Sequence, residues 1–326
     1  MRLKVAIIGL GKIGMGYDLE LDPKNFILSH AMACKNHDDF DLICGVDASH
    51  INRAAFTAKY NKPAYPNVVE GLLGHQIDVV IIATPTGSHL NILKKVLSCQ
   101  KPRVILCEKP LAYSLEDARE IVDICENSGV ILIVNYMRRS DPATLKIKNL
   151  IKDGAIKKPI SGVVRYTKGF LHNGSHFFNL LEYLFGSSTD FMVISIWRAL
   201  EGGDFELDVK VNFEDGNFLF ISQSDQDNAD CSMELIGPSG KINYAKGGES
   251  VIWHKSLEAT CNAYPSNNPN AETIENNMKK YQESVLNELV NLINGDAYNL
   301  CSGRDALKTT ESIMKILNTA SIEWKN

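Results

Sequence analysis

The sequence has no basic excess, no long apolar run and no paired cysteines, and each absence excludes a class of protein. With 34 basic and 39 acidic residues, the net charge of −5 gives no basis for binding nucleic acid or an anionic membrane surface. No stretch approaches the roughly 18 apolar residues that cross a bilayer. The eight cysteines form no CxxC pair and the histidines no cluster, which argues against a zinc site and a disulfide framework. We therefore expect no metal, no nucleic-acid or membrane partner, and reduced cysteines in a cytoplasmic protein.

The composition that remains is that of a folded globular protein. Hydrophobic residues make up 44% and charged residues 22% of the 326 residues. The N-terminus leads at once into a short apolar run broken by glycines, without the apolar core and cleavage site of a signal peptide, so we expect a buried strand there. The length favours two domains, which we place at residues 1–135 and 136–326.

The first 135 residues alternate short apolar runs with helical patterns. The runs are continuously apolar, as in strands covered on both faces, and serine caps open two of the helical patterns, those at residues 49–60 and 114–128. This alternation predicts an α/β domain with a doubly wound parallel sheet of the Rossmann type. Strands are expected at residues 4–8, 42–46, 78–83, 103–107 and 130–134, and helices at residues 49–60, 88–98 and 114–128.

The rhythm of the second domain is different. After a helix at residues 142–152, strand-like segments follow one another, with turn signals at residues 214–216 and 237–240. The pattern predicts an α+β domain with a large, mostly antiparallel open sheet. Strands are expected at residues 160–168, 190–199, 205–213, 218–224 and 231–236, helices at residues 272–293 and 305–322, and a loop at residues 264–270.

A glycine-rich turn directly follows the first strand. In Gly9-Leu10-Gly11-Lys12-Ile13-Gly14 the first glycine allows the tight turn, the second lets the backbone approach a pyrophosphate, and the third permits close packing. A helix N-terminus after the turn would face the anion. An incidental glycine-rich turn is the alternative, and the strand context argues against it.

Asp47 ends the second strand, where a carboxylate can accept hydrogen bonds from both hydroxyls of the adenosine ribose. The same carboxylate would repel a 2′-phosphate. Because no arginine follows immediately and Arg53 lies half a helix away, we expect NAD rather than NADP. A helix N-cap is the alternative role, and one aspartate could serve both.

An insertion separates Gly14 from Asp47 by more than the usual roughly 20 residues. Residues 17–25 are acidic, contain proline and lack helical spacing, so the helix should resume near Ser29-His30-Ala31-Met32-Ala33. The segment at residues 17–28 could hang over the cofactor or the substrate, or be inert surface.

Four further motifs, in this order, resemble the Gfo/Idh/MocA oxidoreductase family. They are Ala83-Thr84-Pro85-Thr86-Gly87-Ser88-His89, Cys107-Glu108-Lys109-Pro110-Leu111-Ala112, Asn135-Tyr136-Met137-Arg138-Arg139 and Gly174-Ser175-His176. The similarity runs the length of the chain, and the family fold it implies is the one expected above, with an open sheet that often serves as an oligomer interface.

The resemblance implies a role for each motif. Glu108 would contact the nicotinamide ribose, Lys109 would reach the reacting hydroxyl and lower the cost of a developing alkoxide, and Pro110 would hold the turn with a peptide bond that could be cis. A solvated surface charge is the alternative for the lysine. The full set of cofactor-binding residues implied is Gly9, Gly11, Lys12, Ile13, Gly14, Asp47, Ala83, Thr84, Pro85, Thr86, His89, Glu108, Lys109, Asn135 and Arg138.

His176 matches the family's catalytic histidine and would act as general base. The pattern commonly has an aspartate four residues before and another three residues after this histidine, where this chain has His172 and Asn179. On one helix face His172 would adjoin His176, as an imidazole in place of a carboxylate. A His-x-x-x-His metal site is the alternative, but the sequence shows no acidic or cysteine partner nearby.

The function implied is hydride transfer between nicotinamide and a secondary alcohol or ketone of a sugar, cyclitol or nucleotide-sugar. Two alternatives stay open: a tightly bound NAD used for transient oxidation in a lyase, epimerase or hydrolase, and a non-catalytic cofactor-binding sensor. The exposed sheet face of the second domain favours a homodimer or homotetramer.

Overall fold

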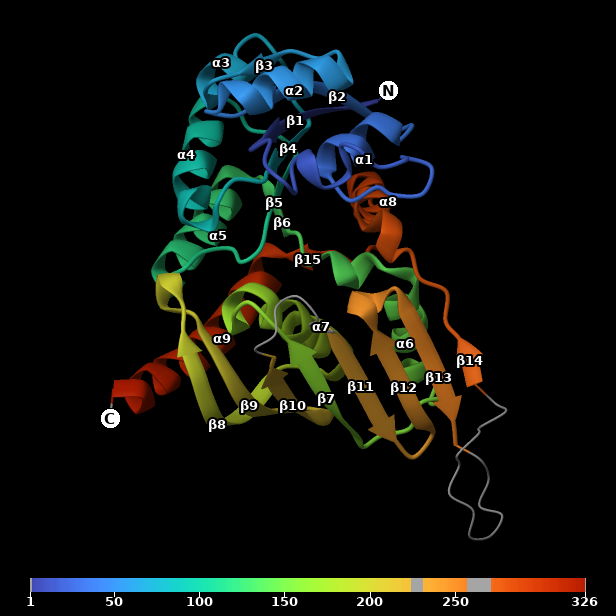
Figure 1. Ribbon diagram of the computed structural model, residues 1–326. Helices are drawn as coiled ribbons and strands as arrows, with labels where there is room; N and C mark the ends of the chain where they lie inside the picture. The colour runs from blue at the N-terminus through green and yellow to red at the C-terminus, as the bar shows by residue number, and fades with distance from the viewer. Residues whose placement is uncertain (1, 224–230, 257–270, 326) are drawn as a thin grey trace, which may run out of the picture. The chain divides into compact units, whose positions relative to one another are not determined.

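The structure is a computed structural model that describes residues 2–223, 231–256 and 271–325 (Figure 1). Cys261 and the loop expected at residues 264–270 lie outside these residues. The chain divides into two compact units, Met1–Ser140 with Lys279–Thr310, and Asp141–Met278 with Glu311–Asn326. The expected boundary at 135/136 thus differs from this division in one main respect, the return of residues 279–310 to the first unit.

The first unit is built on a seven-stranded sheet in the order β15-β6-β5-β4-β1-β2-β3. Strands β1 to β6 pair in parallel, and β15 joins the edge antiparallel to β6. The predicted doubly wound parallel sheet is therefore confirmed, with β3 and β15 as additions. The strands are β1 (Leu3–Ile8), β2 (Phe40–Val46), β3 (Ala64–Tyr65), β4 (Val79–Ile82), β5 (Val104–Cys107), β6 (Ile131–Val134) and β15 (Cys301–Ser302).

Helices cover both faces of this sheet, which is why its strands are continuously apolar. Val5 and Ile7 pack into one buried cluster with helices α1, α2 and α8, whereas Ala6 and Ile8 pack into another with α3, α4 and α5. Ser49 and Ser114 cap α2 and α5 as predicted. The helices are α1 (His30–Asn36), α2 (His50–Tyr60), α3 (Val68–Leu72), α4 (His89–Cys99), α5 (Leu115–Ser128) and α8 (Tyr281–Asn294).

Helix α8 reaches the first unit from late in the chain and lies beside α1 (Figure 1). Its Val285, Leu286 and Leu289 are buried in the cluster that contains Val5 and Ile7. The prediction of one helix over residues 272–293 was wrong at its start: the helix begins at Tyr281, and Ala271–Thr273 form strand β14. The prediction began the helix too early, because a strand of only three residues is too short to show its own apolar pattern.

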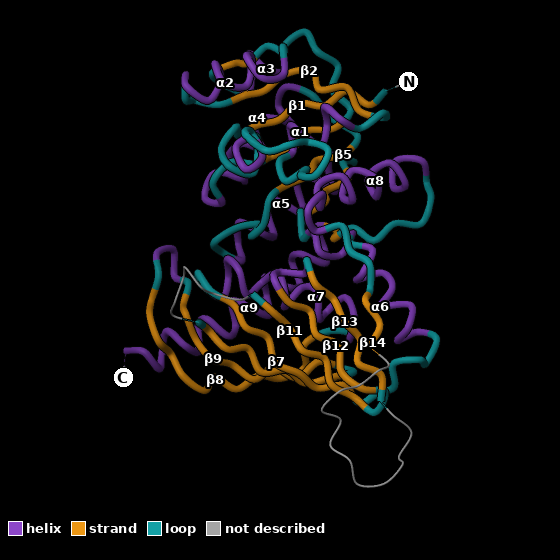
Figure 2. Tube along the Cα trace, turned by 45° about the vertical axis from the view of Figure 1, so that its right-hand side comes forward, coloured by secondary structure: helices purple, strands orange, loops and turns teal. Residues whose placement is uncertain are grey.

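Figure 2 draws the strands of the second unit's sheet in orange. The sheet has eight strands in the order β14-β13-β12-β11-β7-β10-β9-β8 and is mostly antiparallel, as predicted. Within the described residues of this second sheet, the one parallel pair is β7 with β10. Strands β12 and β13 were missed because their apolar residues alternate over only six positions each. The strands are β7 (Ile160–Tyr166), β8 (Ser188–Ala199), β9 (Phe205–Phe213), β10 (Gly216–Ser222), β11 (Ser232–Gly237), β12 (Gly240–Ala245), β13 (Ser250–Lys255) and β14.

One face of this sheet is packed against α6 (Pro142–Lys152), α7 (Ser175–Phe185) and the second half of α9 (Gly303–Lys325). The other face is open at edge strand β8, where Met192, Ile194 and Trp197 are 50–61% exposed. Register shifts at Val193/Ser195 and Ile196/Arg198 keep these three side chains off the packed face. An apolar stripe along a sheet edge is therefore left uncovered.

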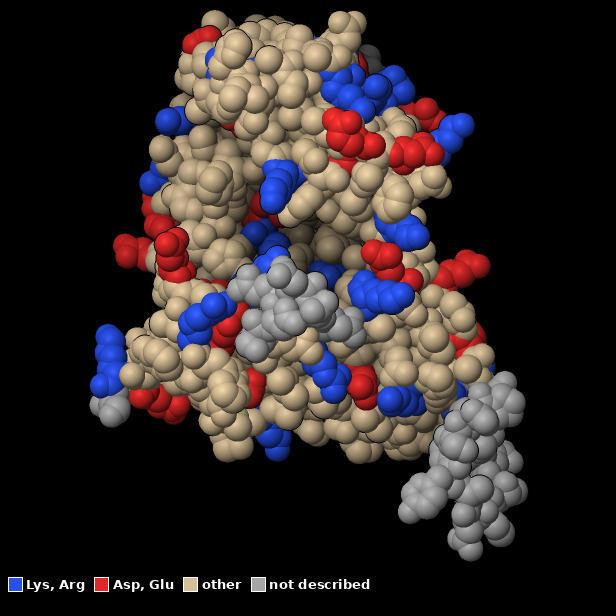
Figure 3. Space-filling view, in the orientation of Figure 1, with Lys and Arg blue, Asp and Glu red and all other residues tan. Residues whose placement is uncertain are grey.

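The surface charges and the cysteines agree with a globular protein that has no disulfide framework among its described residues. Basic and acidic side chains are mixed over the described part of the face seen in Figure 3. In the described residues, no helix combines the length and apolarity that a membrane crossing requires. The seven cysteines within the described ranges are all free thiols, and five of them are buried.

Candidate functional site

The predicted site residues of the first unit follow the carboxyl ends of neighbouring parallel strands. The first residue after each of four strands donates its backbone N–H to the last residue of the next strand in the sheet. The bonds are Gly9 to Val46 O (2.8 Å), Ala83 to Ile8 O (2.7 Å), Glu108 to Ile82 O (2.9 Å) and Asn135 to Cys107 O (2.8 Å). This row brings the glycine turn and three of the motifs to one sheet edge, where α/β sheets bind ligands.

The glycine turn needs its first and third glycines for different reasons. Gly9 has φ +98°, and a Cβ there would lie 2.5 Å from the Ala83 carbonyl oxygen. A Cβ on Gly14 would overlap the Gly9 carbonyl. In contrast, a Cβ on Gly11 would have no neighbour within 4 Å, so this backbone is open to a ligand. Lys12, which follows, is exposed, and Ile13 is half-buried.

Helix α1, which follows the insertion, is hydrogen-bonded back to the glycine turn that precedes it. Met15 N–H bonds to Gly11 O as in a first helical turn, but the regular helix α1 begins only at His30. His30 N–H and Ala31 N–H then donate to the carbonyls of Ile13 and Gly14, at 3.1 and 3.0 Å. The anion-facing element expected directly after the glycines is therefore a single turn, and the predicted resumption near Ser29 is confirmed.

The insertion itself is anchored by a buried carboxylate. Asp18 is 0% exposed and accepts hydrogen bonds from Leu28 N–H, Ser29 N–H and the Ser29 hydroxyl at 2.5–2.8 Å. Burial raises the pKa of Tyr281, and the nearby Glu108, Tyr17 and Asp18 raise it further. The start of the insertion therefore lies near the Glu108 motif, with its two ends built into the fold.

A cavity of about 470 Å³ opens beside the glycine turn, a size typical of small-molecule sites. Gly9, Gly11 and Asp47 line it, together with Thr84 and Pro85. The Asp47 carboxylate accepts hydrogen bonds from Leu10 N–H at 2.8 Å and Ser49 N–H at 2.7 Å. Ser49, rather than Asp47, caps helix α2. The carboxylate thus joins the ends of two strands at the wall of the cavity, and these residues fit an adenosine and its pyrophosphate.

Arg53 lies closer to this wall than its position in the sequence suggested. Its guanidinium donates to the backbone carbonyls of Asp47 and Ala48, both at 2.8 Å. One turn of α2 brings residue 53 back over residues 47 and 48, which corrects the view that half a helix keeps it away. One guanidinium nitrogen is thereby committed to the backbone.

The loop after β4 is fixed by a buried histidine. His89 is 1% exposed, and its ring nitrogens lie 3.1 Å from Leu111 O and 2.9 Å from Thr84 O. Burial lowers the pKa of His89, although both backbone contacts oppose the shift. A neutral ring has one N–H and donates to one of the two carbonyls. His89 therefore lies between Thr84 in the loop after β4 and Leu111 in the loop after β5.

Glu108 is the centre of a buried polar network. Its Oε1 lies 2.8 Å from His30 Nε2 and accepts from Asn135 Nδ2 at 2.6 Å, and Asn135 also donates to Gln282 Oε1 at 3.3 Å. Three polar atoms of this network have no hydrogen-bond partner among the described residues: His30 Nδ1, Asn135 Oδ1 and Gln282 Nε2. Lys109 follows with a cis peptide bond to Pro110, and Arg138 is buried in the turn after β6.

The charge of Glu108 is set by competing effects. Burial raises its pKa, but the hydrogen bonds from His30 and Asn135 and the nearby charge of Lys109 outweigh burial and hold the pKa below its ordinary value. Neither His30 nor Gln282 was predicted as a site residue. A single buried histidine in a helical run gives no signal by itself, and Gln282 comes from a helix distant in sequence.

We expect His30→Leu to destabilise the protein by about 2–3 kcal/mol at pH 7, the scale of a hydrogen bond to a charged group. A depressed carboxylate pKa contributes stability that is present above the ordinary value of 4.5 and lost as pH falls through the lower folded value. The gap from wild type should therefore shrink below pH 4.5. Urea unfolding at several pH values measures it.

Two variants make this test specific. His30→Gln keeps an N–H near the Nε2 position and should recover about half of the loss. His37→Leu removes a histidine from the end of the same helix, whose ring contacts Asn287, and should cost less than about 1 kcal/mol. A gap for His30→Leu that stays constant down to pH 3 would contradict the assignment.

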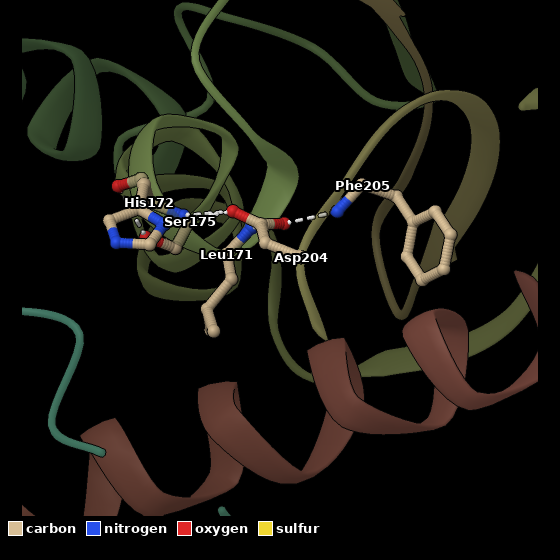
Figure 4. A network of polar contacts seen from close by, with 5 residues as sticks. All are labelled: Leu171, His172, Ser175, Asp204 and Phe205. Carbon is tan, nitrogen blue, oxygen red and sulfur yellow. Dashed lines mark hydrogen bonds and ion pairs between the residues drawn. The ribbon is translucent and has the colours of Figure 1, made fainter. Parts of the chain in front are cut away.

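In the second unit, His172 has an acidic partner, Asp204, although the sequence shows no acidic residue near it. His172 lies in a π-helical turn, Phe170–Gly174, and its Nδ1 is 2.9 Å from Oδ2 of Asp204 (Figure 4). Asp204 is 0% exposed. Thirty-two residues separate the pair, so no local spacing could predict it. The π-helical turn also replaces the regular α-helix on which the shared face of His172 and His176 was predicted.

His176 and Asn179 are in α7, His176 half-buried and Asn179 wholly buried. The described residues contain no group of three His, Cys, Asp or Glu side chains arranged to hold a metal ion. In the second unit, the two histidines predicted as site residues are thus both present, and His172 is paired with a carboxylate.

Comparison with known proteins agrees with this fold. Residues 3–136 match the model of an oxidoreductase family with an NAD-binding Rossmann fold, Gfo/Idh/MocA. A D-apiose dehydrogenase from Paraburkholderia graminis is 32% identical over 52% of this chain and 41% of its own length. The scyllo-inositol 2-dehydrogenase (NAD(+)) of Bacillus subtilis is 33% identical over 52% of this chain and 44% of its own length. The alignments thus span less than half of each of these two relatives.

Solved structures share the fold of both units. The WlbA dehydrogenase from Bordetella pertussis, in complex with NADH and UDP-GlcNAcA, superimposes with a TM-score of 0.73 at 18% identity, over 99% of this chain and 96% of that one. The family model covers strands β1 to β6, the glycine turn and the strand ends that carry the motifs up to Asn135. Residues 3–136 of this chain therefore match the NAD-binding Rossmann domain of the Gfo/Idh/MocA oxidoreductases.

Proposed function

We propose that the protein transfers a hydride between a nicotinamide cofactor and a secondary alcohol or ketone of a sugar, cyclitol or nucleotide-sugar. The observation that carries this is the row of strand ends that sets the glycine turn, Asp47 and the Glu108-Lys109 pair along one sheet edge. The names of relatives, which include apiose and inositol dehydrogenases, support the substrate class.

The residues then take distinct roles. The nicotinamide ring, when bound, accepts a hydride from the carbinol carbon or returns it. Glu108, kept ionised by its network, would accept hydrogen bonds from the adjoining ribose. The Lys109 ammonium would stabilise the negative charge that grows on the substrate oxygen. A histidine of the second unit, His176 or His172, would take the hydroxyl proton.

NAD is the cofactor that the cavity favours. Asp47 lines the cavity as a carboxylate, which would accept from ribose hydroxyls and repel a phosphate. Arg53, a nearby cation that could offset this repulsion, already donates to two backbone carbonyls. We expect NAD to bind at least tenfold more tightly than NADP.

Purified protein tests the proposal. Fluorescence titration with NADH and NADPH gives the cofactor preference, and absorbance of the reduced nicotinamide is followed with panels of free sugars, cyclitols and nucleotide-sugars. We expect turnover with at least one member of these panels. Tight cofactor binding without turnover on any panel would favour a sensor, and copurified cofactor that does not exchange would favour transient oxidation.

Assembly and location complete the proposal. The apolar stripe of Met192, Ile194 and Trp197 on β8 supports a homodimer or homotetramer that covers this face. Light scattering gives the mass of the assembly, and a monomer at micromolar concentration would contradict the proposed oligomer.

The free thiols among the described cysteines support a cytoplasmic location, which cell fractionation tests.

A further inference from the structure

The contacts of Asp204 point to a paired proton acceptor. Its Oδ1 accepts from Leu171 N–H and Phe205 N–H, both at 2.8 Å, and its Oδ2 lies 3.1 Å from His172 N and 2.9 Å from His172 Nδ1 (Figure 4). A carboxylate accepts hydrogen bonds only, so Nδ1 carries the proton of a neutral imidazole and Nε2 carries the lone pair. Asp204 thus fixes the tautomer in which Nε2 is basic.

The backbone around His172 is shaped to receive this carboxylate. Lys168 and Gly169 have φ of +59° and +91°, and a Cβ on Gly169 would overlap Asp204 Oδ2. The π-helical turn that follows directs the N–H groups of Leu171 and His172 at the same carboxylate. π-Helical turns and left-handed residues are costly and gather at functional sites. The His172 side chain is 36% exposed, whereas Asp204 is wholly buried, so the imidazole is reachable and its partner is shielded.

We propose that His172 is the proton acceptor of the reaction and that Asp204 is its positioning residue. This rests on the proposed function and deepens it. As the hydride leaves the carbinol carbon for nicotinamide, the O–H bond breaks, its proton passes to His172 Nε2 and the carbonyl forms. Asp204 stabilises the resulting imidazolium, which later releases the proton to water. A carboxylate–imidazole pair then stands where the family pattern has a single aspartate.

The pH profile separates the two histidines. Because the base must be neutral to accept a proton, kcat/KM should fall as the pH is lowered and the base becomes protonated. Other titratable groups stand on the elements packed against this turn: Arg165 and Tyr166 on β7, Lys168 after it, Glu206, Asp208 and Lys210 on β9, and His176, Glu182 and Tyr183 on α7. His176→Asn tests the histidine among these directly.

The decisive variant keeps the structure and removes the base. His172→Asn places an amide N–H near the Nδ1 position, so the bond to Asp204 survives while Nε2 is lost. We expect kcat/KM for oxidation to fall on the order of 10²-fold, with loss of the acid limb of the profile and unchanged cofactor affinity. Asp204→Asn should lower kcat more than KM changes, with a shifted acid limb. His254→Asn changes a histidine of the same sheet that contacts Asn243, and serves as the control with unchanged kinetics.

Several outcomes would overturn the assignment. If His172→Asn keeps the wild-type profile and His176→Asn loses the acid limb, the base is His176 and the proposal is wrong, although the dehydrogenase function stands. If Asp204→Asn changes only thermal stability, Asp204 is not a positioning residue. If wild-type protein turns over no substrate with either cofactor, the proposed function fails first, independently of these variants.

Discussion

Lys109→Ala is expected to lower kcat/KM on the order of 10²–10³-fold while leaving the affinity for NADH within about threefold. The reason is the timing of the charge: the substrate oxygen becomes negative only as the hydride leaves, so a fixed ammonium stabilises the transition state more than the ground state. Steady-state kinetics with the substrate found by screening, combined with NADH fluorescence titration, separates these two effects.

Two further variants sharpen the Lys109 prediction. Lys94→Ala removes a surface lysine that pairs with Glu120 at 2.5 Å, and should leave both constants unchanged. Lys109→Arg keeps the charge but replaces a compact ammonium by a planar fork, and should recover little activity. Retention of more than a tenth of wild-type kcat/KM in Lys109→Ala would falsify the role given to this amine.

Gly9→Ala is expected to lower the free energy of unfolding on the order of 2–4 kcal/mol, the largest stability change among our predictions. An alanine would have to keep φ near +98° with its methyl 2.5 Å from the Ala83 carbonyl, and both partners are backbone at the ends of adjacent strands. Neither strand end is able to move without breaking the Ala83-to-Ile8 bond. Urea unfolding gives the loss directly.

Gly11→Ala provides the matched control because its methyl would meet nothing within 4 Å. Its stability should stay within about 0.5 kcal/mol of wild type. Affinity for NADH should nevertheless fall at least tenfold, because the methyl would occupy space that the proposal assigns to the pyrophosphate. Unchanged affinity in a stably folded Gly11→Ala would place the dinucleotide elsewhere.

The first unit could largely be predicted because its signals are local. A continuous apolar run, a glycine turn and a serine cap each lie within a few residues, so most strands and helices up to residue 134 could be predicted, although the short β3 and α3 could not. Helix α8 could not be assigned to this unit, because its apolar face fits either core and the choice depends on packing. Strand β14 was hidden because three residues are too few for a period of two to show.

The site was predictable to the same extent. Lys109, Glu108 and Asp47 follow strands and stand in recognisable motifs. His30 and Asp204 do not, because each acts through a partner 78 or 32 residues away. Asp204 follows two glycines and resembles any loop aspartate until the π-helical turn is built around it. Residues that orient other side chains have no spacing of their own, so they emerge only from the folded chain.

The return of residues 279–310 to the first unit has a consequence for synthesis. A ribosome delivers the chain from its N-terminus, so the Rossmann sheet emerges well before Val285, Leu286 and Leu289, which close one of its two apolar clusters. Until these side chains have been synthesised, the apolar sheet face beside α1 is exposed to water. The strands of the second sheet are translated during this interval. The nascent Rossmann domain therefore lacks part of its core while more than a hundred further codons are translated. Its exposed apolar face makes it a substrate for a chaperone during this time.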